Sequence, residues 1–326
     1  MLNLNSNSRA GKAETNPKKT VIWAIDAFAQ PSDLKLQASA ALCSLFPHAE
    51  IIPVYVLSEL SFEKRGFSRI LRLALKPFAF RSINQHIDAL EAFNFKKPRV
   101  LVEESASFGE CARKIVRFAL KVHADVIIVG SHGKPTMQRL LGYSFSDAIL
   151  SLSPLPVVVV GPGVAPCCRP PHLIVFAGNF NIDCHDAFTH ILRLAEGFQA
   201  ELHLFYKAQP GFSRLQDSRL LHHQKRRKCH TKACSHVASI DELGRCQELS
   251  RSKGIKTTFV CENSRETGSQ GIVEYLSRLD VASALLATVA EAGTLAEMLL
   301  GNLIRDVVRR SRVPVYVAPR TSFLVP

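Results

Sequence analysis

The stretch Ser153-Pro-Leu-Pro-Val-Val-Val-Val-Gly-Pro162 returns near the end of the chain as Ser311-Arg-Val-Pro-Val-Tyr-Val-Ala-Pro319. In each copy a proline precedes a short valine-rich run and a second proline follows it. Short apolar runs bounded by such breakers are typical of strands buried on both faces of a parallel sheet. A self-similarity at a fixed distance signals repeated structure, so the chain is predicted to hold two copies of one domain, about 155 residues apart.

The remaining segments of the two halves match in the same order. Thr20-Val-Ile-Trp-Ala-Ile25 matches His172-Leu-Ile-Val-Phe-Ala177, and each is followed by a polar loop and an amphipathic helix, at 31–46 and at 184–199. Further strands are expected at 51–56, 99–103 and 125–129 in the first half and at 201–206, 256–261 and 280–286 in the second. This alternation predicts the α/β class: two tandem, doubly wound, Rossmann-like domains, each with a five-stranded parallel sheet.

Shifts in composition set the expected domain boundaries. Residues 1–19 are polar and lack apolar periodicity, so a disordered tail is expected. The first domain is assigned to 20–162 and the second to 172–320. Between them, 163–171 belongs to a stretch rich in proline and glycine, which is typical of a linker.

The two valine-rich runs are expected to lie at the edges of their sheets. An exposed apolar edge strand invites pairing with another strand. Val157–Val160 and Val315–Val317 can satisfy each other, which predicts an internal pseudo-dimer of the two domains. Formation of a homodimer by the whole chain is left open.

Composition and charge limit the function classes. Hydrophobic residues make up 47% and charged residues 21%, as in ordinary folded proteins, and no apolar run reaches the ~18–20 residues of a membrane span. Nine scattered cysteines form no regular framework, which favours reduced thiols and a cytoplasmic location. The net charge of +13 suits an anionic partner, but nucleotide, nucleic acid and an acidic membrane surface all remain open.

Two basic segments break the symmetry between the halves. Residues 62–80 place four cations at three- or four-residue spacing between apolar residues, which predicts an amphipathic helix. We expect this helix to cover its own domain, with binding to an anionic surface as the alternative. Residues 219–236 contain several histidines and cysteines without the paired spacing of a zinc site, and are interpreted as a solvated loop.

A candidate phosphate loop follows the fourth strand. Gly130-Ser-His-Gly133 is followed by Gly142-Tyr-Ser144 at the start of an apolar helical pattern. Glycines allow close approach of a phosphate, and a helix N-terminus favours negative charge. A tight strand-to-helix turn is the alternative interpretation. The fragment Gly133-Lys134-Pro-Thr136 mimics a Walker A motif, but that motif would require glycine at the position of Ile128.

The loop, the strand order and the valine-rich ending together resemble the universal stress protein family in its tandem form, over 20–162 and 172–319. The ATP-binding members carry two glycines separated by two residues, then nine residues, a third glycine and Ser or Thr. Gly130 and Gly133 match the first two glycines, and Ser144 matches the hydroxyl. The third glycine falls on Tyr143, with glycine displaced to Gly142.

The resemblance implies roles for individual residues. The family's first-strand aspartate, which contacts the nucleoside, matches Asp26, and the valine near the adenine matches Val56 approximately. The phosphates of ATP would contact the loop and the first helical residue. The full set of implied nucleotide-binding residues is Asp26, Val56, Gly130, Gly133, Gly142, Ser144 and Phe145.

The second half departs further from the family pattern. Gly178 stands where the aspartate is expected, and Ala287 and Ala290 are matched to the paired glycines. A methyl group crowds a bound phosphate wherever glycine is required. We therefore expect ATP binding in the first domain only.

No motif of an established catalytic class is present in the sequence. Together with this absence, the resemblance implies a non-enzymatic stress-response protein that binds an adenine nucleotide and no metal. Two alternatives stay open. The first is a nucleotide-free interaction protein of the same fold, and the second is a weak ATPase that uses His132, Lys134 or Asp26.

Overall fold

A computed structural model describes residues 19–27, 29–58, 69–88, 90, 93–103, 107–131, 144–167, 169–178, 185–207, 232–262, 268–279, 284–289 and 304–319. The strands are β1 (Thr20–Ala24), β2 (Glu50–Leu57), β3 (Arg99–Val102), β4 (Val126–Gly130), β5 (Val157–Val160), β6 (Leu173–Ala177), β7 (Glu201–Lys207), β8 (Thr257–Glu262), β9 (Ala284–Val289) and β10 (Val315–Ala318). The helices are α1 (Pro31–Gln37), the π-helix η1 (Ala38–Cys43), α2 (Arg69–Asp88), α3 (Phe108–Lys121), α4 (Phe145–Leu152), α5 (His185–Phe198), α6 (Lys232–Ser252) and α7 (Gly268–Ser277). A further helix covers 304–310.

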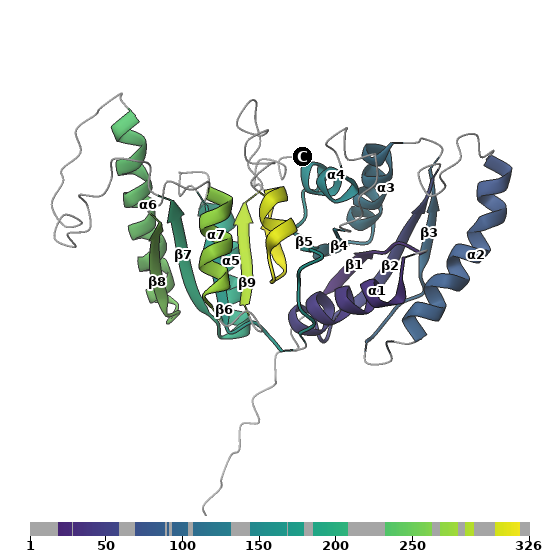
Figure 1. Ribbon diagram of the computed structural model, residues 1–326, viewed down its shortest axis with the longest axis horizontal. Helices are drawn as coiled ribbons and strands as arrows, with labels where there is room; N and C mark the ends of the chain where they lie inside the picture. Colours follow the sequence, from purple (N-terminus) through teal and green to yellow (C-terminus); the bar gives the residue numbers. More distant parts are fainter. Residues whose placement is uncertain are drawn as a thin grey trace, which may run out of the picture.

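All ten strands belong to one sheet, in the order β3-β2-β1-β4-β5-β10-β9-β6-β7-β8. Within each half every strand pair is parallel. The two halves have the same order, and Figure 1 shows them side by side, with the first half on the right and the second on the left. The predicted tandem, doubly wound α/β architecture with five strands per domain is confirmed.

The halves are joined by β5 and β10, which pair antiparallel. Val159 lies opposite Val315, Val158 opposite Tyr316, and Val157 opposite Val317. Both strands are fully buried. The predicted pairing of the two apolar edges is therefore confirmed, and it leaves neither edge open.

Helices cover both faces of this sheet, and each face forms a core that continues through both domains. Alternate side chains of a strand point to opposite faces. In β1, Val21 and Trp23 enter the core beneath α1, η1, α2, α5 and α6. Ile22 and Ala24 enter the core beneath α3, α4, α7 and the 304–310 helix.

The predicted linker packs against the second domain. Val164 is buried in the first of these cores. The N–H of Ala165 donates to the carbonyl of Arg312 at 3.3 Å. A Cβ added at Gly161 would lie 2.1 Å from the carbonyl oxygen of Val308, so the glycine is required by this close approach. The connection therefore contributes contacts to the interface between the domains.

Several predicted element bounds differ from the structure. The helix expected at 31–46 is an α-helix that continues as the π-helix η1. The basic helix begins by Arg69 and extends to Asp88, while 59–68 lie outside the described residues. The strand expected at 280–286 is β9, which begins at Ala284. Of the loop expected at 219–236, residues 232–236 are the first turn of α6 and the rest lies outside the described residues. Among the described helices, none combines the length and apolar character that a bilayer crossing requires.

Candidate functional site

The strand order brings two of the predicted site residues together. β1 lies between β2 and β4 in the sheet. The connection after β1 leads to β2 and the connection after β4 leads to β5, in the opposite direction, so the topological switch point lies between β1 and β4. Open α/β sheets bind ligands at such a switch point, beyond the carboxyl ends of the strands. Asp26 lies two residues after the end of β1, and Gly130 is the last residue of β4. Ala24 of β1 pairs with Val129 of β4, so the two strands end at the same level of the sheet. Asp26 is partly exposed at this edge.

Gly130 has a second reason to be glycine. A Cβ added there would lie 2.1 Å from the side-chain nitrogen of Gln37 and 2.5 Å from its amide carbon. Gln37 is only 4% exposed, and its amide oxygen accepts a hydrogen bond from Nε1 of Trp23 at 3.2 Å. The φ of Gly130 lies outside the left-handed region. The requirement at this position is therefore space for the Gln37 amide.

Ser144 is the N-cap of α4, at the same edge of the sheet. Its Oγ accepts from the N–H of Asp147 at 3.2 Å and donates to Oδ2 of Asp147 at 2.8 Å. The N–H of Ser144 donates to the same carboxylate oxygen at 2.9 Å, which completes a capping box. Oγ of Ser144 also lies 2.9 Å from Oγ of Ser146.

The capping box leaves two backbone donors at the start of α4. The first N–H groups of a helix have no partner inside the helix. In the described part of the chain, the N–H groups of Phe145 and Ser146 have no acceptor. These donors and the helix dipole favour an anion at this end of α4.

Asp147 also contacts the second domain. Its Oδ1 accepts from Nε of Arg305, in the 304–310 helix, at 3.0 Å. The side chain of Asp147 is 14% exposed and that of Arg305 is 31% exposed. A cation from the second domain therefore lies beside the capped end of α4, a contact that the sequence interpretation did not anticipate.

The other predicted site residues fall into two groups. Val56 lies inside β2 and is 7% exposed, with its side chain in the core beneath α3, so its contact with a nucleoside stays a prediction. Gly133 and Gly142 lie outside the described residues, as do Tyr143, His132 and Lys134.

The structural register corrects the alignment of the second half. The N–H of Ile127 donates to the carbonyl of Pro156 at 3.0 Å, and the N–H of Leu286 donates to that of Pro314 at 3.2 Å. Leu286 is thus the counterpart of Ile127, which makes Val289 the counterpart of Gly130. The match of Ala287 to a loop glycine was wrong, because Ala287 is a buried residue of β9.

The aspartate position also moves. The N–H of Glu50 donates to the carbonyl of Lys19 at 2.8 Å, and the N–H of Glu201 donates to that of His172 at 2.9 Å. Counting from these pairs, Gly178 corresponds to Ile25. The counterpart of Asp26 is the next residue, which lies outside the described part of the chain. A small pocket in the second domain lies between the sheet and the helices α7 and 304–310, and its lining is almost entirely apolar: Ala177, Ile272, Leu286, Thr288, Ile304, Val307 and Val315.

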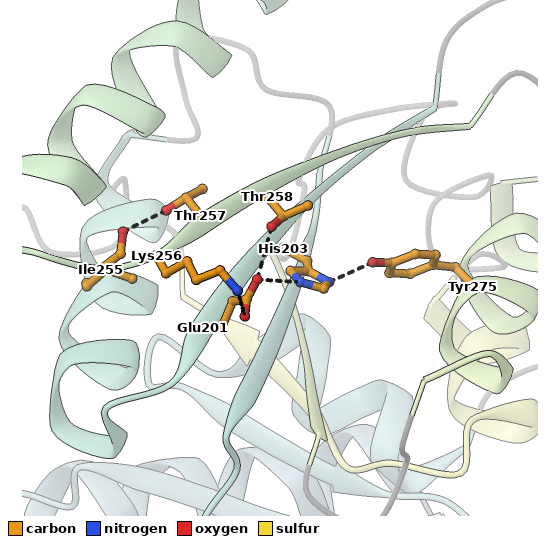
Figure 2. Close-up of polar contacts among 7 residues, drawn as sticks. All are labelled: Glu201, His203, Ile255, Lys256, Thr257, Thr258 and Tyr275. Atoms are coloured by element: carbon orange, nitrogen blue, oxygen red, sulfur yellow. Dashed lines mark hydrogen bonds and ion pairs between the residues drawn. The ribbon is translucent and has the colours of Figure 1, made fainter.

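A polar cluster in the second domain escaped the sequence interpretation. Figure 2 shows Glu201 and His203 of β7, with Oε1 of Glu201 3.1 Å from Nε2 of His203. Nδ1 of His203 lies 2.6 Å from the hydroxyl of Tyr275, and Lys256 donates to Glu201 at 2.8 Å. Thr258 also donates to Glu201, at 3.0 Å. The only signal in the sequence was the alternation that places 201 and 203 on one face of a strand.

Glu201 and Lys256 carry the opposite charges of this cluster and form an ion pair. The hydrogen bond from Lys256 lowers the pKa of Glu201, and burial raises the pKa of the Tyr275 hydroxyl. Glu201 is the first residue of β7, so the cluster lies at the amino ends of the strands, away from the ligand-binding edge. It ties β7, β8 and α7 together. No group of three or more metal-ligating side chains occurs within the described ranges.

Comparisons with known proteins agree with this geometry. The model of the universal stress protein family matches residues 18–161 and again 172–319. A universal stress protein from Archaeoglobus fulgidus is similar in structure with a TM-score of 0.63 at 17% identity, over 92% of this chain and 96% of that one. A putative universal stress protein from Pseudomonas aeruginosa has a TM-score of 0.52 at 12% identity, over 94% and 95%. No curated protein matches the sequence.

These two structures share the fold over nearly the full length of both chains, and the family model covers both halves separately. The chain therefore belongs to the universal stress protein family, as a tandem member with two copies of the domain.

Proposed function

We propose that the protein is a non-enzymatic stress-response protein that binds one adenine nucleotide, ATP in the first instance, in its first domain. The observation that carries this proposal is the difference between the two switch points. The first has Asp26 and Gly130 beside a serine-capped helix with two N–H donors. Among the described residues of the second domain, Val289 takes the place of Gly130, and the pocket between the sheet and α7 is almost entirely apolar.

The proposed roles follow from the chemistry of each group. Asp26 accepts hydrogen bonds from the nucleoside, in keeping with the family resemblance. The N–H groups of Phe145 and Ser146 and the hydroxyl of Ser144 donate to a phosphate at the start of α4. Gly133 and Gly142, which belong to the same motif, complete the loop in this proposal.

The carboxylate of Asp147 sets a condition on phosphate binding. It accepts the hydroxyl of Ser144, so a phosphate must compete with it for that donor. Like charges repel at short range. Arg305 offsets this repulsion through its ion pair with Asp147.

Calorimetric titration of the full chain with MgATP tests the proposal. Ser144→Ala is expected to weaken ATP binding about tenfold, since a hydrogen bond to a charged group contributes about 1.5 kcal/mol or more. Ser151→Ala is the matched control, because Ser151 lies at the other end of the same helix and its hydroxyl donates to the local backbone carbonyl of Ala148 at 3.2 Å. Equal effects of the two variants, or no binding by the unmodified chain, would contradict the proposal.

Asp26→Asn addresses the nucleoside end of the ligand. It is expected to weaken adenosine and ATP by the same factor, because the carboxylate contacts the part that they share. Asp33→Asn, in α1, is the control for the loss of one negative charge. Incubation of the complex is expected to leave ATP intact, and turnover that is lost in Asp26→Asn would favour the ATPase alternative.

A second candidate function rests on the first half of α2. Leu73 and Phe78 are 50% and 60% exposed, and Lys76 and Arg81 are exposed beside them. The second half of α2 packs on the sheet through the buried Ile83. An exposed apolar and basic helix suits an anionic membrane surface. We propose that binding to an anionic membrane surface through α2 is the second function.

Vesicle sedimentation separates this candidate from a protein partner. The chain is expected to bind vesicles that contain anionic lipid and not neutral vesicles, and Phe78→Ser is expected to reduce that binding. Phe259→Ser is the control, because Phe259 is an exposed aromatic residue on β8 in the other domain. Equal binding to neutral vesicles, or an equal effect of the control, would contradict it.

We also propose that the protein works in the cytoplasm with reduced thiols. Within the described residues, Cys111, Cys167, Cys246 and Cys261 form no disulfide. Burial raises the pKa of the Cys111 thiol, which keeps it protonated and unreactive. Acid quenching of intact cells, followed by denaturation, alkylation and mass spectrometry, is expected to find these thiols reduced.

A further inference from the structure

Two charged residues at equivalent positions of the two domains meet across the domain interface. Asp147 lies six residues before Ser153, and Arg305 lies six residues before Ser311. The equivalence is structural as well, because Oγ of Ser153 bonds to the carbonyl of Leu155 at 2.9 Å and Oγ of Ser311 to that of Val313 at 2.8 Å. The ion pair of 3.0 Å therefore joins one position to its own counterpart.

The same relation holds at the centre of the sheet. Val158 lies five residues after Ser153, and Tyr316 lies five residues after Ser311. These two residues are directly opposite each other in the antiparallel β5–β10 pair, and both are buried in the same core. The local two-fold axis that relates the domains thus passes between Val158 and Tyr316 and between Asp147 and Arg305.

Residues on such an axis would face themselves in a pair of identical domains. We propose that these pairs make the two domains specific for each other and prevent pairing of like domains from two copies of the chain. In a pair of two first domains, Asp147 would face Asp147. Val158 would face Val158, and the space that the Tyr316 ring fills in the core would stay empty. Two second domains would set Arg305 against Arg305 and crowd two tyrosines into one core position.

A third contact supports the same specificity. Gly161 lies against the carbonyl of Val308, where a Cβ would approach to 2.1 Å. Eight residues after Ser311, the counterpart of Gly161 is Pro319. Two second domains would bring the ring of Pro319 to a carbonyl that leaves no room for it. Unlike the proposed nucleotide function, this inference concerns assembly: the β5 and β10 edges accept only the complementary domain.

Charge exchange in the full chain tests the proposal. Arg305→Asp alone sets two carboxylates together and is expected to speed amide hydrogen exchange in β5 and β10 about tenfold, the scale of reversing a partly exposed ion pair. In the Asp147→Arg background the same substitution is expected to slow that exchange. Asp147→Arg also removes the capping box at Ser144. This loss occurs in both chains that carry Asp147→Arg, so it cancels from the comparison between them.

Arg310→Asp is the matched control, because Arg310 pairs with Asp306 inside its own domain. It is expected to leave exchange in β5 and β10 unchanged. A change of the same size in this control, or an Arg305→Asp effect of the same sign in both backgrounds, would overturn the proposal.

An uncharged exchange tests it independently. Val158→Tyr and Tyr316→Val are each expected to speed exchange at the interface, and the double variant is expected to return most of the way to the unmodified chain. Light scattering is expected to find no like-domain dimer in the unmodified chain. A double variant no slower in exchange than either single variant would contradict the proposal.

Discussion

Gly130→Ala tests what the glycine at the end of β4 is for. A new Cβ would lie 2.1, 2.5 and 2.9 Å from three atoms of the Gln37 amide, and real Cβ atoms essentially never approach that closely. Gln37 cannot move into solvent, because it is 4% exposed. The amide must therefore shift and give up its hydrogen bond from Trp23, which is itself fully buried.

The expected cost follows from two effects. Overpacking of a filled core site costs about 1–3 kcal/mol. A buried donor left without its acceptor costs about 1–3 kcal/mol more. Gly130→Ala is therefore expected to destabilise the first domain by about 2–6 kcal/mol, even with no ligand present. In a Gln37→Ala background the new methyl group has room, so the same substitution should cost less than about 1 kcal/mol.

Urea denaturation followed by tryptophan fluorescence suits this test, since Trp23 is the only tryptophan and it bonds to Gln37. The four chains of the cycle are the unmodified protein, Gly130→Ala, Gln37→Ala and the double variant. If Gly130→Ala lowered the free energy of unfolding equally in both Gln37 backgrounds, or did not lower it measurably, the glycine would not be required by the packing of Gln37.

Two further predictions concern the interface and the polar cluster. Val158→Pro removes a backbone donor from a strand paired on both sides, which costs at least about 1–3 kcal/mol for the buried acceptor left unpaired, and should uncouple the domains; a single cooperative melt with unchanged compactness in solution scattering would count against it. Lys256→Met removes the group that lowers the pKa of Glu201. Because a depressed carboxyl pKa stabilises the fold above the unfolded value of 4.5 and loses that effect as pH falls through the folded pKa, the destabilisation by Lys256→Met should be largest near neutral pH and shrink below pH 4.5. Lys253→Met, which breaks a pair with the more exposed carboxylate Glu196, is the control, and a pH-independent difference would contradict the assignment.

Much of the fold was predictable because its strands are short, apolar and bounded by breakers. The pairing of β5 with β10 followed from the two valine-rich runs, since an apolar edge needs a partner. β9 was misplaced because Val281 and Ala282 precede it with only Ser283 between, so no glycine or proline marks its start at Ala284. The alignment of Ala287 to a loop glycine failed for the same reason.

The candidate site was predictable only in part. Asp26 and Ser144 follow from strand ends and helix caps, which are local signals. The packing of Gln37 on Gly130 joins residues 93 positions apart, and the pair of Asp147 with Arg305 crosses between domains. Neither contact leaves a local pattern in the sequence, because each depends on the register of the sheet and the packing of helices on it.

We propose that the first domain binds an adenine nucleotide and that the second does not. The most direct measurement is to denature the freshly purified full chain and quantify the released small molecules by mass spectrometry. The expected result is about one adenine nucleotide per chain, lost in Gly133→Trp, which would fill the loop. Two nucleotides per chain would contradict the proposal that the second domain binds none. Release of no nucleotide, together with no ATP binding on titration, would contradict nucleotide binding by the first domain.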